Sequence, residues 1–117
     1  MPSSIQVGQS AEDLASQILK NEGYVVIERN FRSRFGEIDL IATKGDALYF
    51  VEVKARSSVR YGYPEEAVTV SKLRKIQKTS EYYCFMHPNM PKKLRILVVA
   101  IIVTNQIMES YKIIDVY

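Results

Sequence analysis

The chain has 117 residues and a net charge of +3, and its 47% hydrophobic and 25% charged residues are an ordinary globular balance. This length supports one hydrophobic core, so we expect a single domain over residues 1–117. One cysteine and one histidine exclude an internal disulfide and a metal site built from Cys and His clusters.

The sequence predicts a cytoplasmic protein without a membrane-spanning segment. Residues 1–10 lack the basic region and the apolar core of a secretory signal. The longest apolar run, 96–103, is too short to cross a bilayer, so no membrane partner is expected. The single cysteine, Cys84, is typical of a protein in a reducing compartment.

The first predicted element is an amphipathic helix that begins after Ser10 and ends at Gly23. Its apolar residues recur at helical spacing and form one stripe: Ala11, Leu14, Ala15, Ile18 and Leu19. Glu12 lies beside this stripe, so it either points along the sheet towards later acidic residues or only stabilises the helix N-terminus. The β-branched run 24–29 follows as the first predicted strand.

Residues 36–54, GEIDLIATKGDALYFVEVK, predict two antiparallel strands joined by a tight turn. The turn is the dipeptide Gly-Asp at residues 45–46, a favoured two-residue hairpin loop. Side chains alternate along each strand, so this turn fixes which residues are opposed. Four charged residues then share one face as two opposed pairs, Asp39 with Glu52 and Glu37 with Lys54.

Three carboxylates in so small a patch need a physical reason, because opposed like charges destabilise a sheet. A hard divalent cation such as Mg²⁺ between Asp39 and Glu52 would supply one, since such ions prefer oxygen ligands. The alternative is a solvated face, on which Glu37 and Lys54 form an ordinary ion pair. The neighbouring residues on both faces are apolar, which argues against solvation, because unpaired carboxylates are costly there. The residues alone leave both interpretations open.

Basic residues are concentrated after this hairpin. Residues 1–53 carry five basic and eight acidic side chains, whereas residues 54–78 carry seven basic and two acidic ones. Five of the basic residues are candidates for contacts with the phosphates of a nucleic acid: Arg56, Arg60, Lys72, Arg74 and Lys75. The alternative is a solvated surface, which charged helix faces commonly form.

The remaining predicted elements are a helix and two strands. The helix begins at Thr69 or Ser71 and ends before Pro88. The nearly continuous apolar run 94–104 predicts a strand buried on both faces, and the strand 108–116 follows after a turn. The element order is therefore α-β-β-β-α-β-β, which predicts an α/β fold with a mixed β-sheet flanked by helices.

These motifs resemble the YraN-like family of small bacterial proteins, which is placed in the PD-(D/E)XK nuclease superfamily. The resemblance covers about residues 8–99. Its most specific part is the pair of blocks GEIDLI and FVEVK, with twelve residues between Asp39 and Glu52. It implies a restriction-endonuclease-like sheet and a single nuclease-like domain over 1–117, with a core similar to that of archaeal Holliday-junction resolvases.

The resemblance also implies roles for individual residues. Asp39 and Glu52 would bind Mg²⁺ or Mn²⁺, with the backbone carbonyl of Val53 as a further ligand. Lys54 would orient the attacking water or stabilise negative charge on the phosphate. Glu12 would be the acidic residue that the first helix contributes to catalysis.

Glu37 would hold Lys54 in place as its partner. The chain departs from the family pattern at two positions. Ile38 stands where the superfamily name expects proline, and Leu97 stands where the family typically has an aspartate. The resemblance therefore implies no catalytic role for that position of the fourth strand.

The implied activity is metal-dependent endonuclease cleavage of nucleic-acid phosphodiesters, with DNA favoured over RNA. No motif for reading base edges is visible, so we expect selection by nucleic-acid structure rather than by sequence. Two alternatives stay open: a non-catalytic nucleic-acid-binding module that retains the fold, and a protein-interaction subunit. Paired cuts in a junction would need a two-fold homodimer, for which residues 94–104 and 113–117 are the candidate contacts.

Overall fold

The structure is a computed structural model that describes residues 10–58, 60 and 62–117. Residues 1–9, on which part of the predicted absence of a secretory signal rests, lie outside the described residues. The elements are, in order, α1 (Ala11–Asn21), β1 (Val25–Ser33), β2 (Gly36–Lys44), β3 (Ala47–Arg56), η1 (Pro64–Ala67), α2 (Val70–Met86), β4 (Lys93–Thr104) and β5 (Ile107–Asp115). The predicted order is confirmed, and the short 3₁₀ helix η1 is an additional element. None of the described helices is long and apolar enough to span a membrane.

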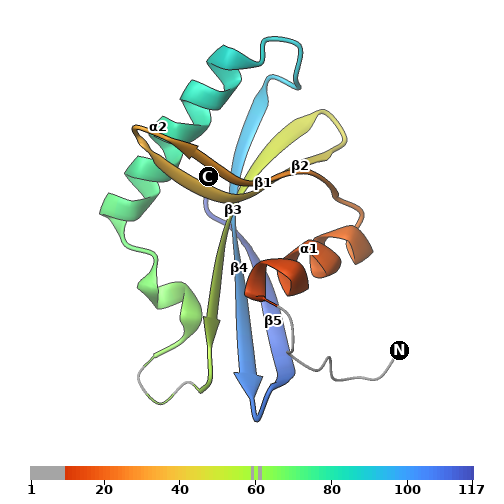
Figure 1. The fold of residues 1–117 in the computed structure, drawn as a ribbon, viewed down its shortest axis with the longest axis vertical. Helices are drawn as coiled ribbons and strands as arrows, with labels where there is room; N and C mark the ends of the chain where they lie inside the picture. Colours follow the sequence, from red (N-terminus) through yellow and green to blue (C-terminus); the bar gives the residue numbers. More distant parts are fainter. Residues whose placement is uncertain (1–9, 59, 61) are drawn as a thin grey trace.

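The five strands form one mixed sheet in the order β1-β2-β3-β4-β5, with β3 at its centre (Figure 1). Strands β3 and β4 are parallel, and every other neighbouring pair is antiparallel. Short turns join the antiparallel neighbours, whereas α2 returns the chain to the start of a parallel strand. The predicted mixed β-sheet flanked by helices is therefore confirmed.

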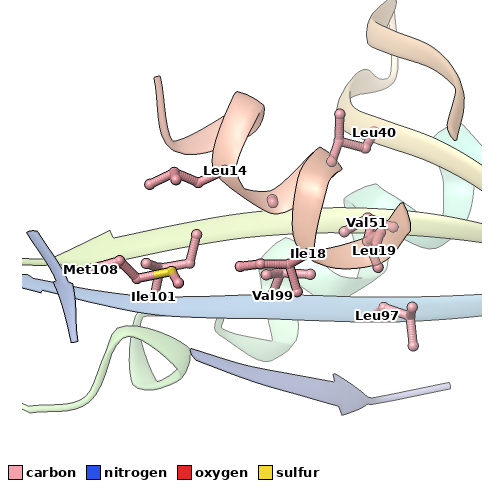
Figure 2. Close-up of a cluster of buried hydrophobic side chains, with 10 residues drawn as sticks. Leu14, Ile18, Leu19, Leu40, Val51, Leu97, Val99, Ile101 and Met108 are labelled. Carbon is pink, nitrogen blue, oxygen red and sulfur yellow. The ribbon is translucent and has the colours of Figure 1, made fainter. Parts of the chain in front are cut away.

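Each helix covers one face of the sheet (Figure 1). Leu14, Ile18 and Leu19 of α1 belong to one buried cluster with Val51 and Leu97, as Figure 2 shows. Leu97, which stands where an aspartate is typical of the family, is thus a core residue. The cluster on the other face joins α2 to the sheet and includes Ile76, Tyr83, Ile41, Phe50 and Ile96. Strand β4 is accordingly buried on both faces, as predicted.

The helices begin and end at residues that the sequence predicts. Ser10 Oγ accepts a hydrogen bond from the backbone N–H of Asp13 at 3.1 Å. Of the two candidate caps of α2, Thr69 is the one used, and its Oγ1 accepts from the N–H of Lys72 at 3.2 Å. Gly23 follows α1 with a φ of 94°, a left-handed conformation that glycine adopts without strain.

Strand β1 is longer than predicted. It spans Val25–Ser33 rather than 24–29. A β-bulge near its start and the left-handed residue Asn30, with a φ of 55°, let the strand change direction without ending. The extension carries Phe31 beneath α2, where its ring centroid lies 5.1 Å from that of Tyr83. This packing, which local sequence does not reveal, explains the additional length.

The β2–β3 hairpin has the predicted register over most of its length. The ladder starts at the two-residue turn and continues to Leu40 opposite Val51. Beyond that pair, β2 continues alongside β1, and β3 continues alongside β4. Asp39 and Glu52 therefore lie at the fork where the two strands separate.

The start of β2 is expected to be intolerant of a side chain at Gly36. This residue has a φ of 150°, and a Cβ there would lie 3.0 Å from the buried Oγ1 of Thr79 on α2. We expect Gly36→Ala to lower the free energy of unfolding by about 1–3 kcal/mol, measured by urea denaturation, because the strained hairpin must move away from α2. Gly45→Ala is the matched control, since Gly45 also has a positive φ, 61°, but no atom within 4 Å. Equal losses in the two variants would contradict this explanation.

Candidate functional site

A cleft of about 460 Å³ lies at the fork, beside the first turn of α1 and the N-terminal half of α2. Seven charged residues of the described chain line it: Glu12, Glu37, Asp39, Glu52, Lys54, Lys72 and Lys75. The four residues that the family resemblance assigns to catalysis are among them. They come from three different elements, so their meeting in one cleft depends on the fold and not on proximity in sequence.

Glu52 is a buried charged residue, with 5% of its surface exposed. Its Oε2 lies 2.6 Å from Lys72 Nζ and 3.6 Å from Lys54 Nζ. A buried carboxylate is costly unless positive charge compensates it, and two ammonium groups do so here. The fold therefore holds Glu52 as a paired carboxylate at the inner end of the cleft.

Asp39 has a different environment from its neighbour Glu52. Its Oδ2 accepts a hydrogen bond from the backbone N–H of Val53 at 2.8 Å. Burial is the main cause that raises the pKa of Asp39 from 3.8 to about 7; the hydrogen bond from Val53 opposes this rise, and the negative charge of Glu52 adds to it. The charged form of Asp39 is therefore disfavoured in the cleft, and a bound cation would stabilise it.

Lys54 and Lys72 compete for the carboxylate of Glu52. The neighbouring Lys72 ammonium, followed by burial, lowers the pKa of Lys54. The hydrogen bond to Glu52 raises the pKa of Lys72. Lys72 is therefore the principal counter-ion of Glu52, in agreement with its shorter distance of 2.6 Å, and Lys54 is the lysine that releases a proton more readily.

The oxygen atoms at the fork fit a hard divalent cation. Asp39 and Glu52 supply two carboxylates, and Val53, whose backbone carbonyl is the predicted further ligand, also lines the cleft. Within the described residues, no group of three or more Asp, Glu, His or Cys side chains is arranged to hold a metal ion. The side chains thus offer two ligands, and Mg²⁺ is commonly bound by one or two carboxylates together with waters and substrate phosphates.

The predicted contact between Glu37 and Lys54 is wrong. Glu37 Oε2 lies 3.3 Å from Arg32 Nε, and Lys54 pairs with Glu52 instead. The reason is that β2 leaves β3 beyond Leu40 and pairs with β1, which places Glu37 opposite Arg32. Glu37 still lines the cleft, but its partner is a residue of β1 and not the lysine of the motif.

The residues predicted to bind phosphates lie only partly in the cleft. Lys72 and Lys75 line it, and the ammonium of Lys72 is paired with Glu52. Arg56 at the end of β3, Arg60 in the following loop and Arg74 on the exposed side of α2 are not among the described residues that line it. Their contacts with phosphates stay a prediction for the surface around the cleft.

Lys72 has a second role that the sequence analysis missed. It was predicted only as a phosphate contact, whereas its ammonium is the nearest positive charge to Glu52, at 2.6 Å. The sequence does indicate where Lys72 lies along the helix. Thr69 is the N-cap, so Lys72, three residues later, lies in the first turn of α2. Which way that turn faces depends on how α2 packs on the sheet, and local sequence does not determine it.

Comparison with known proteins gives a family but no activity. The model of the "Uncharacterised protein family UPF0102" matches residues 11–101. A UPF0102 protein of Persephonella marina is 44% identical over 98 residues, which cover 84% of each chain. UPF0102 proteins of Syntrophomonas wolfei and Cytophaga hutchinsonii are 42% and 47% identical, over 86% and 83% of this chain and 87% and 85% of theirs. The predicted resemblance to the YraN-like family is confirmed by these matches.

The raised pKa of Asp39 predicts how stability depends on pH. The folded protein binds the proton of this carboxyl more tightly than the unfolded chain, whose pKa is near 3.8. Its contribution to stability is therefore complete below about pH 4 and is lost as the pH rises towards 7. We expect Asp39→Asn to raise the melting temperature clearly at pH 8 and much less at pH 5, measured in EDTA.

Glu37→Gln is the control for this measurement. It removes a carboxylate from the same cleft, but the Glu37 side chain is 49% exposed. Its effect on the melting temperature is expected to change little between the two pH values. An Asp39→Asn variant whose melting temperature differs from wild type equally at pH 5 and pH 8 would contradict the assigned burial of this charge.

Proposed function

This chain belongs to the uncharacterised protein family UPF0102, and we propose that it is an endonuclease that hydrolyses phosphodiester bonds of nucleic acids, DNA rather than RNA. The observation that carries the proposal is the cleft in which Asp39 and Glu52 lie beside Lys54. A buried and a half-buried carboxylate next to a lysine with a lowered pKa are typical of a site for hydrolysis rather than of a solvated surface. The family name states no activity, so the support comes from the chemistry of the cleft.

We propose Mg²⁺ or Mn²⁺ as the cofactor, held by Asp39, Glu52 and the backbone carbonyl of Val53. When bound, the cation would supply Lewis-acid chemistry to the scissile phosphate and to the attacking water. The raised pKa of Asp39 supports this assignment, because burial and the neighbouring carboxylates of Glu52 and Glu12 disfavour its charged form, and a bound cation would stabilise that form.

The remaining steps use residues of this chain. Lys54, with its lowered pKa, would orient the attacking water and donate to the negative charge that develops on the phosphate. Glu12, at the N-terminus of α1, also lines the cleft and would help to hold the water. Lys72 and Lys75 would bind the phosphates on either side of the cut.

This arrangement supports selection by structure rather than by sequence. The basic residues of the cleft are lysines, which contact phosphates as point charges and carry no information about bases. A cytoplasmic location and a homodimer that makes paired cuts stay predictions.

The second candidate is a nucleic-acid-binding module without catalysis. It is favoured by the ion pair of Lys72 with Glu52 at 2.6 Å, because the protein already compensates this carboxylate without a metal. The module would bind phosphates through the same lysines, and its affinity would not depend on divalent cations.

Cleavage assays separate the two candidates. Labelled linear, single-stranded, flap and four-way-junction DNA would be incubated with Mg²⁺, Mn²⁺ or EDTA. We expect metal-dependent cutting by wild type and a loss of at least about 100-fold in Glu52→Gln and in Lys54→Ala. Glu109→Gln and Lys20→Ala, which change exposed charges outside the cleft, are the matched controls. Absence of cutting by wild type on every substrate, with DNA binding that survives EDTA, would favour the binding module.

Metal binding is tested without any substrate. A cation at about five times its Kd adds about 1 kcal/mol to the stability of a protein that binds it only when folded. We therefore expect Mn²⁺ to raise the melting temperature of wild type by a few degrees. Asp39→Asn and Glu52→Gln are expected to abolish the rise, whereas Glu109→Gln retains it. A rise of the same size in all four proteins would place the cation elsewhere.

A further inference from the structure

A second groove lies on the other side of the β1–β2 hairpin from the cleft. It has a volume of about 540 Å³. Its walls include the arginines Arg32 and Arg34, the rings of Phe31, Tyr82 and His87, and Met86. Two guanidinium groups and three rings in one groove form a surface that neither the family name nor the proposed hydrolysis explains.

The groove and the cleft share a single wall. Arg32 lies opposite Glu37 in the hairpin, and Ser33 lies opposite Gly36. Glu37 and Gly36 line the cleft, whereas Arg32 and Ser33 line the groove. Opposed residues of antiparallel strands are about 4.5–5.5 Å apart at Cα. A bound polymer that passes over the tip of the hairpin would therefore run directly from the groove into the cleft.

The tip of the hairpin holds the walls of the groove in place. The ring centroid of Phe35 lies 4.9 Å from the guanidinium of Arg34, 5.5 Å from Lys78 Nζ and 5.5 Å from the ring of Tyr82. Cation–π contacts of this kind order a guanidinium without neutralising it. Arg34 and Tyr82 therefore both contact Phe35 and both line the groove, one as a cation and one as a half-buried ring.

The charge of the groove suits a polyanion. Among the described residues that line it, none is acidic. The carboxylate paired with Arg32 is that of Glu37, and the two groups lie 3.3 Å apart. Both side chains are exposed, 75% for Arg32 and 49% for Glu37. Exposed pairs of this kind contribute little to stability, so a phosphate would replace Glu37 at Arg32 without a large loss.

We propose that this groove binds an unpaired segment of the nucleic acid whose backbone enters the cleft. A base would stack on Tyr82, and the adjacent phosphates would contact Arg34 and Arg32, because stacking on rings and cationic contacts to the backbone are how single strands are held. The inference rests on the proposed function, since it requires a nucleic acid in the cleft. It narrows the substrate class to DNA with a single-stranded extension beside the cut.

Binding in EDTA tests the groove independently of cleavage. The probes are a blunt DNA duplex and the same duplex with a short unpaired extension, at its 5′ or 3′ end, that carries 2-aminopurine. Tyr82→Ala and Arg34→Ala alter the groove, and Tyr82→Phe retains a ring for stacking. Phe85→Ala is the matched control, because Phe85 lies on the same helix, is 81% exposed and does not line the groove or the cleft.

Wild type is expected to bind the extended duplex more tightly than the blunt one, with quenching of the 2-aminopurine fluorescence. Tyr82→Ala and Arg34→Ala are expected to lose about fivefold or more in affinity for the extended duplex and little for the blunt one. Tyr82→Ala should also lose the quenching, whereas Tyr82→Phe and Phe85→Ala retain it.

Variants that bind both duplexes as wild type does, or that lose affinity for both equally, would overturn the proposal for the groove. The outcome is separate from that of the nuclease. A wild-type protein that shows the expected binding but cuts nothing in Mg²⁺ or Mn²⁺ would contradict the endonuclease and retain the groove. A wild-type protein that binds neither duplex in EDTA would overturn the groove proposal, whereas the endonuclease is judged by cleavage in Mg²⁺ or Mn²⁺.

Discussion

The hydrogen bond from the Val53 N–H to Asp39 is the contact on which the cleft depends. A strand that loses its neighbour leaves backbone donors without partners, and such donors are costly when buried. Asp39 supplies the missing acceptor directly beyond the last ladder pair, Leu40 with Val51. The two strands are then able to separate while β3 stays paired with β4, and the cleft opens at their fork.

The same contact makes the charges of the cleft asymmetric. Two lysines form ion pairs with Glu52, whereas Asp39 accepts a hydrogen bond from the backbone N–H of Val53. A cation would gain most at Asp39, but it would have to replace the Lys72 ammonium, which lies 2.6 Å from Glu52. A substrate phosphate that accepts Lys72 would remove this competition. In the proposed function, cation and substrate would therefore strengthen each other's binding, and the coupling would be equal in both directions.

Sequence reasoning identified the parts of the site that local rules govern. Alternation along the strands and a two-residue turn are enough to bring Asp39 and Glu52 to neighbouring positions. The same rule failed two residues further along, at Glu37, because it assumes that paired strands stay paired, whereas β2 leaves β3 for β1. The contact of Lys72 with Glu52 was beyond such rules, because it depends on where α2 lies over the sheet. Side-chain spacing within a helix contains no information about that position.

In our proposals, the β1–β2 hairpin connects the chemistry of the cleft to recognition of the substrate. Gly36 lets the hairpin approach α2 so closely that a Cβ there would lie 3.0 Å from Thr79 Oγ1. One side of the hairpin then forms a wall of the cleft, and the other forms a wall of the groove. In our proposals, α2 supplies lysines to the first surface and Tyr82 to the second. A nucleic acid that lay across both would be selected by the path of its backbone and by whether a base is free to leave its stack. Such selection by structure would require no contact with base edges, because the fixed separation of a charged cleft and an aromatic groove would itself be the criterion.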